Sequence, residues 1–119
     1  MKSLYVLSGA TGMTGSELVR QILEAEKDSL IIGFDNFFAS SIDTVKEYLH
    51  NPQFEFYEYD INNPTQMQKI EDEVKNKKSA YERTVYINCA AVVHTEHFYE
   101  VEHTWETNVI SMKSFLEQA

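Results

Sequence analysis

Three of the four glycines in this sequence lie three residues apart within the stretch 8–15. The stretch follows an apolar run and precedes a helical pattern. In that context Gly9 allows a tight turn, Gly12 lets the backbone approach a pyrophosphate, and Gly15 lets the helix pack closely on the strand. Amides at the helix N-terminus then point at the anion. An ordinary turn that happens to use glycine is the alternative, but this concentration of glycines favours phosphate binding.

A second chemical position, Asp35, ends the next apolar run, twenty residues after Gly15. A carboxylate at this spacing would accept hydrogen bonds from both hydroxyls of an adenosine ribose. It would also repel a 2′-phosphate, so the sequence predicts NAD in preference to NADP. A helix cap or a loop acid is the alternative, because aspartate often ends strands. Taken with the glycines, we favour the ribose-binding role.

The apolar pattern predicts the elements that position these residues. Continuous apolar character at 30–34 is typical of a strand covered on both faces, as in parallel sheets. We expect strands at 2–8, 30–34, 54–59 and 84–91, and helices at 13–26, 42–50, 64–78 and 98–119. This alternation predicts an α/β fold, a Rossmann-like parallel sheet in the order 3-2-1-4 with flanking helices. The crevice for a cofactor would lie between strands 1 and 4, where the winding reverses.

Composition excludes several classes of function. With 119 residues, of which 43% are hydrophobic, the chain can form one globular domain over 1–119. The formal net charge of −9 leaves no basic face for nucleic acid or for an acidic membrane. No apolar run approaches the roughly 20 residues of a membrane helix, and no secretory signal is visible. The single cysteine, Cys89, cannot form an internal disulfide, so we expect a cytoplasmic protein.

Short motifs along the whole chain resemble those of one family. They are the glycine turn, Asp35-Asn36 followed by Ser40-Ser41, Asp60-Ile61, the stretch 88–91, and Asn108. The set is similar to the extended short-chain dehydrogenase/reductases, the NAD-dependent epimerases and dehydratases of nucleotide sugars. Thr14 is polar where the family usually has a bulky apolar residue, and Asn88 stands where many members have histidine.

The resemblance implies a role for each matching segment. Asp60 and Ile61 would contact adenine, the end of the fourth strand would line the nicotinamide ribose, and Asn108 would lie on the following helix. The predicted NAD-contacting residues are Gly9, Thr11, Gly12, Met13, Thr14, Gly15, Asp35, Asn36, Ser40, Asp60, Ile61, Cys89, Ala90, Ala91 and Asn108.

The family's catalytic motif is not found in this sequence. Members use a tyrosine with a lysine four residues later, assisted by a serine or threonine. None of the seven tyrosines here is followed by lysine at that spacing. The resemblance therefore implies an incomplete domain: the cofactor-binding portion of an epimerase or dehydratase, with no catalytic residues. A nucleotide sugar would bind only with a further C-terminal part. The alternative is a stand-alone dinucleotide-binding module whose occupancy signals to a partner.

Two further predictions concern metal ions and self-association. His94, His97 and His103 lie close together with glutamates between them, but their spacing matches no recognised zinc motif. We therefore predict no metal site. The fourth strand would form an apolar margin of the sheet, and an unpaired edge invites association with another chain. We therefore predict a homo-oligomer.

Overall fold

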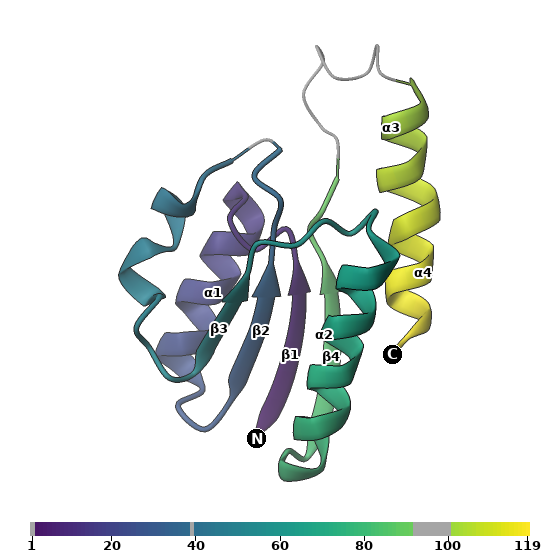
Figure 1. Ribbon diagram of the computed structural model, residues 1–119. Coiled ribbons are helices and arrows are strands. Elements are labelled where there is room, and N and C mark those ends of the chain that lie inside the picture. The colour runs from purple at the N-terminus through teal and green to yellow at the C-terminus, as the bar shows by residue number, and fades with distance from the viewer. Residues whose placement is uncertain (1, 39, 92–100) are drawn as a thin grey trace.

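A four-stranded parallel sheet forms the centre of the computed structural model, which describes residues 2–38, 40–91 and 101–119 (Figure 1). The strands are β1 (Ser3–Ser8), β2 (Leu30–Phe34), β3 (Phe54–Tyr57) and β4 (Arg83–Asn88). Their order is β3-β2-β1-β4, and every pair is parallel. The predicted order 3-2-1-4 is confirmed, and the chain has the α/β, Rossmann-like fold.

Helices cover the two faces of the sheet (Figure 1). Helix α1 (Met13–Ala25) packs its buried residues against one face, together with Val45 from the loop after β2. Helices α2 (Pro64–Lys77) and α4 (Met112–Glu117) pack against the other face. There the rings of Phe34 and Phe115 meet in a T-shaped arrangement, with centroids 5.5 Å apart. Successive side chains of a strand point to opposite faces, so each strand supplies both cores.

The stretch 42–50 does not form the single helix that the sequence predicts. It forms two 3₁₀ turns, Ile42–Thr44 and Lys46–Tyr48. The Thr44 hydroxyl donates to the carbonyls of Thr11 (2.7 Å) and Ser41 (3.2 Å), and Ser41 caps the first turn. The bonds to Ser41 compete with a regular helix, and the bond to Thr11 ties the stretch to the glycine turn. Only Val45 of the stretch is buried.

The last helical segment and two strand ends also differ from expectation. The described part of the last helical segment contains α3 (Val101–Trp105), a π-helical segment (Glu106–Ser111) and α4. The expected start at residue 98 lies outside the described residues. Strand β3 ends at Tyr57 and β4 at Asn88, so residues 58–60 and 89–91 have left the sheet.

Strand β4 lies at one margin of the sheet, as predicted. None of its six residues is buried, whereas all six of β1 are. Association of copies through this margin stays a prediction. Within the described residues, no helix has the length and apolar character needed to cross a lipid bilayer.

Candidate functional site

A cleft of about 1270 Å³ opens at the carboxyl ends of the strands and is lined by the segments that follow all four of them. Every predicted site residue except Asn108 lines this cleft. Asn108 lies in the π-helical segment, and its neighbour Thr107 faces the cleft instead. His103 also lines the cleft, whereas His94 and His97 lie outside the described residues.

The three glycines of the turn differ in what surrounds them. Gly9 has φ +68°, and a Cβ there would lie 2.5 Å from the carbonyl carbon of Cys89. A Cβ on Gly15 would lie 2.0 Å from the Gly9 carbonyl oxygen. Packing within the protein therefore requires both glycines. A Cβ on Gly12 would meet only that same oxygen, at 3.5 Å, an ordinary contact. At Gly12 the protein itself has room for a side chain, and the space opens into the cleft.

Helix α1 begins at this turn with its first amides unpaired. Gly12 is the N-cap and can offer no side-chain cap, and the first turn carries no acidic residue. The amide of Ser16 bonds to the Gly12 carbonyl at 2.8 Å, so helix geometry leaves the amides of residues 13–15 without intrahelical partners. Three N–H groups and the positive end of the helix dipole therefore face the cleft, which favours an anion.

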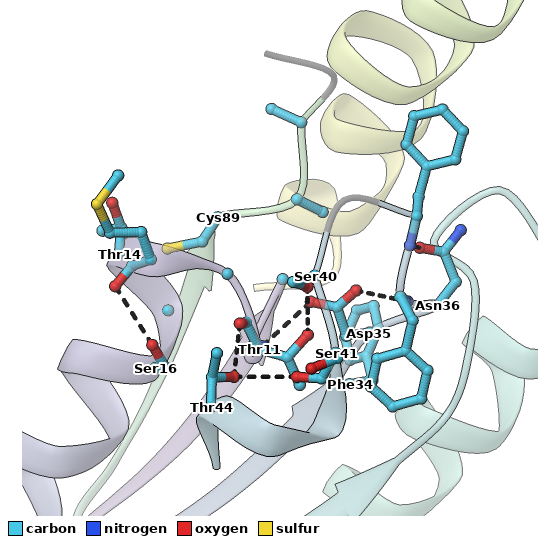
Figure 2. A pocket seen from close by; sticks show the side chains of 18 of the residues that line it. Thr11, Thr14, Ser16, Phe34, Asp35, Asn36, Ser40, Ser41, Thr44 and Cys89 are labelled. Atoms are coloured by element: carbon cyan, nitrogen blue, oxygen red, sulfur yellow. Dashed lines mark hydrogen bonds between the residues drawn. The ribbon is translucent and has the colours of Figure 1, made fainter. Parts of the chain in front are cut away.

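Asp35 is held in a fixed orientation beside this turn (Figure 2). Its Oδ2 accepts a hydrogen bond from the Thr11 amide at 3.1 Å, and its Oδ1 accepts one from the Phe37 amide at 3.0 Å. A carboxylate oxygen can accept two hydrogen bonds, so each oxygen keeps one acceptor position. Asp35 is partly exposed in the cleft. It can therefore receive two hydroxyl groups from a ligand.

The segment after β3 forms another wall of the cleft. Asp60 accepts a hydrogen bond from the Asn62 amide at 2.8 Å, and its own amide donates to the side chain of Gln66 at 2.7 Å. Ile61 is buried in the core between the sheet and α2. Hydrogen bonds to the amide and to the side chain of Asp60 therefore hold this segment in place.

Aromatic rings that the motifs did not indicate also line the cleft. Phe38, from the loop after β2, contacts His103 of α3 with ring centroids 4.4 Å apart. Tyr59 lines the same region and stacks on Tyr57. The contact between Phe38 and His103 joins two segments far apart in sequence, so no local pattern predicts it.

The end of β4 is tied to β1 by a buried serine. The Ser8 hydroxyl donates to the side-chain oxygen of Asn88 and accepts the amides of Cys89 (3.1 Å) and Ala90 (3.3 Å). Cys89 and Ala90 are thereby held at the cleft wall directly beside Gly9. Burial raises the pKa of the Cys89 thiol, which disfavours the reactive thiolate form.

Helix α1 also contributes a charged group beyond the glycine turn. Arg20 lines the cleft, but its guanidinium bonds to Glu17 and Glu24. Hydrogen bonding to Arg20 lowers the pKa of Glu17 to about 2. Glu17 and Arg20 lie about one and two helical turns after the glycine turn, and this spacing could have indicated that they line the cleft. Most of the other lining residues that the sequence did not predict lie in the loop after β2; they include Thr44, Glu47 and Tyr48.

A doubly wound parallel sheet with a glycine turn after its first strand defines the class of Rossmann-like α/β proteins. Within that class, this chain belongs to the NAD dependent epimerase/dehydratase family, whose family model matches residues 5–119. The family-level resemblance drawn from the motifs is confirmed.

Individual relatives share part of the sequence or the fold. UDP-glucuronic acid decarboxylase 5 from Arabidopsis thaliana is 37% identical over 59 residues, 50% of this chain and 17% of that protein. The structure of dTDP-glucose 4,6-dehydratase from Bacillus anthracis in complex with NAD has a TM-score of 0.75 at 23% identity, covering 98% of this chain and 33% of that one. UDP-glucose 4-epimerase from Thermus thermophilus, also with NAD, has a TM-score of 0.69 at 17% identity, covering 97% and 33%. The chain thus spans about a third of these solved structures.

Proposed function

We propose that this chain is the NAD-binding portion of an oxidoreductase that acts on a nucleotide sugar. The observation that carries the proposal is Gly12. Its missing side chain leaves space toward the cleft that the protein does not fill, beside three unpaired helix amides. A pyrophosphate group fits this space, because it needs both close backbone approach and N–H donors.

The other parts of NAD would be bound along the cleft. Asp35 offers one free acceptor position on each oxygen to the two hydroxyls of the adenosine ribose. Asp60 and Ile61 would contact the adenine, and Cys89, Ala90 and Ala91 would line the nicotinamide side. When bound, NAD supplies a nicotinamide ring that accepts and returns a hydride. The chain's own residues bind and orient the cofactor.

Charge in the cleft supports NAD over NADP. A 2′-phosphate would lie close to the Asp35 carboxylate, and like charges repel. Arg20 is the only lysine or arginine among the described lining residues, and it is already bonded to two glutamates. No unengaged lysine or arginine in this part of the chain is therefore placed to neutralise the added phosphate.

The nucleotide-sugar substrate is proposed from the relatives. Enzymes named for UDP-glucuronic acid, dTDP-glucose and UDP-glucose share this family or this fold. The sequence holds no tyrosine with a lysine four residues later. We therefore assign cofactor binding to this chain and expect binding and turnover of the sugar to need residues outside it.

Calorimetric titration with NAD and NADP tests the proposal. We expect NAD to bind more tightly than NADP. Asp35→Asn should weaken NAD binding roughly tenfold or more, because hydrogen bonds to a charged group are lost. Asp28→Asn is the matched control, since Asp28 is exposed, lies between α1 and β2, and does not line the cleft.

Three results would contradict parts of this proposal. Absence of NAD binding by the unmodified chain would overturn the cofactor assignment. Equal binding of NAD and NADP would overturn the preference for NAD. If both asparagine variants weakened NAD binding equally, Asp35 would have no specific role.

A further inference from the structure

Thr11 connects the glycine turn to the loop after β2 through every polar group it has (Figure 2). Its amide donates to Asp35 Oδ2 at 3.1 Å, and its carbonyl accepts from the Thr44 hydroxyl at 2.7 Å. Its hydroxyl lies 2.6 Å from the Ser40 hydroxyl, where either oxygen can be the donor. The residue has no solvent exposure. Each polar group of Thr11 is therefore bonded to a neighbouring residue, and the buried side chain is not exposed to a ligand.

The partners of Thr11 are residues 35, 40 and 44, all in the loop between β2 and β3. This loop carries the carboxylate that would bind ribose, whereas Thr11 itself belongs to the turn that would bind pyrophosphate. A dinucleotide must occupy both places at once. Fixing their separation before the ligand arrives lowers the ordering cost of binding.

We propose that Thr11 is a positioning residue that holds Asp35 and Ser40 in register with the glycine turn, so that ribose and pyrophosphate bind together. The proposal rests on the proposed function, NAD binding in this cleft. It also revises the direct NAD contact that the sequence predicts for Thr11: the residue acts through its partners.

Of the three bonds, only the one to Ser40 uses the threonine side chain. Thr11→Val removes this hydroxyl at nearly constant volume and leaves the two backbone bonds possible. Thr11→Ser keeps the hydroxyl and serves as the conservative control. Ser40→Ala removes the other partner of the same bond, and Ser40 is only partly buried, so this variant is less disturbing to the core.

A purely structural role for Thr11 would give a different result from a positioning role. Loss of general order in the cleft would weaken every dinucleotide to the same extent. Loss of ribose positioning would weaken NAD more than an NAD analogue whose adenosine ribose lacks the 2′-hydroxyl, because the analogue does not use that interaction. The two ligands and the variants form a thermodynamic cycle that measures this coupling.

The experiment is calorimetric titration of the unmodified chain, Thr11→Val, Thr11→Ser and Ser40→Ala with NAD and with the 2′-deoxy analogue. We expect Thr11→Val and Ser40→Ala each to weaken NAD roughly three- to tenfold, the value of one hydrogen bond. Their effect on the analogue should be less than half as large in fold-change. Thr11→Ser should bind NAD like the unmodified chain.

Equal losses for both ligands would overturn the proposal, as would no loss in either variant. Should thermal unfolding show that Thr11→Val does not fold, Thr11→Ala, which removes the same hydroxyl, decides by the same criterion, because Ser40 itself lines the cleft. Failure of the unmodified chain to bind NAD would instead overturn the proposed function, which is a separate outcome.

Discussion

The polar groups at the two ends of the sheet differ in whether they have hydrogen-bond partners within the protein. At the amino end, the Tyr5 hydroxyl donates to the Glu26 carboxylate, Arg83 donates to Ser3, and the Ser3 amide donates to Ser29. These groups satisfy one another. At the carboxyl end, the first amides of α1 and half of the acceptor positions of Asp35 have no partner within the described chain. The amino end is built to stabilise the fold, and the carboxyl end keeps hydrogen-bonding capacity for a ligand.

The largest expected effects come from two glycines at the carboxyl end of the sheet. Gly15 is required for packing, whereas Gly12 leaves space for binding. Gly15→Ala places a Cβ 2.0 Å from the Gly9 carbonyl oxygen, so we expect loss of more than about 3 kcal/mol of folding stability. Gly12→Ala meets nothing closer than 3.5 Å. It should cost at most about 1 kcal/mol, because alanine is a poorer N-cap than glycine, yet it should abolish NAD binding. Thermal unfolding and calorimetric titration measure the two effects.

Two results with the glycine variants would contradict these expectations. Equal destabilisation by both alanines would mean that Gly12, like Gly15, is required by packing. Unchanged NAD binding by a folded Gly12→Ala variant would mean that the space beside Gly12 does not receive the pyrophosphate. The second result would remove the main support for the proposed function.

The fold could be predicted because its signals are local. The runs that became β1 and β2 are continuous and apolar, and the structure buries every residue in them. Right-handed crossovers then fix the order of the strands. The position of Asp35 beside the glycine turn follows from the same rule, because the carboxyl ends of neighbouring parallel strands meet at one edge.

The remaining features depend on contacts between distant segments. The apolar pattern predicts one helix at 42–50, but the stretch forms two short turns, and the Thr44 hydroxyl bonds to Thr11 and Ser41. The π-helical segment brings Thr107, and not Asn108, to the cleft. Periodicity describes a chain segment alone, so it cannot reveal which neighbour will alter the helix.

A smaller effect tests the amino end. Tyr5→Phe removes the hydroxyl that donates to Glu26, and we expect a loss of about 1 kcal/mol of folding stability with no change in NAD affinity. Tyr81→Phe is the matched control, since the Tyr81 hydroxyl has no hydrogen bond within the described chain and the residue is outside the cleft. Urea unfolding and calorimetry measure both quantities. A changed NAD affinity in Tyr5→Phe would contradict the separation of the two ends.

The smallest effect concerns Glu71, another polar group whose partner lies within the protein. Glu71 is buried on α2, and its carboxylate accepts the Tyr86 hydroxyl at 3.0 and 2.9 Å. Burial raises the pKa of Glu71 above its ordinary value of 4.5, although the bond from Tyr86 opposes the shift.

The sign of the resulting pH dependence follows from that shift. The folded protein holds the Glu71 proton more tightly than the unfolded chain, so this contribution to stability is fully present below pH 4.5 and is lost as the pH rises through the raised pKa. Glu71→Gln, which keeps an acceptor for Tyr86, should remove this decline, whereas Glu58→Gln on an exposed site should not. Urea unfolding across this pH range measures the difference. NAD affinity at neutral pH should stay the same in both variants, because Glu71 lies outside the cleft; a change confined to Glu71→Gln would show that the cleft is coupled to the internally paired groups.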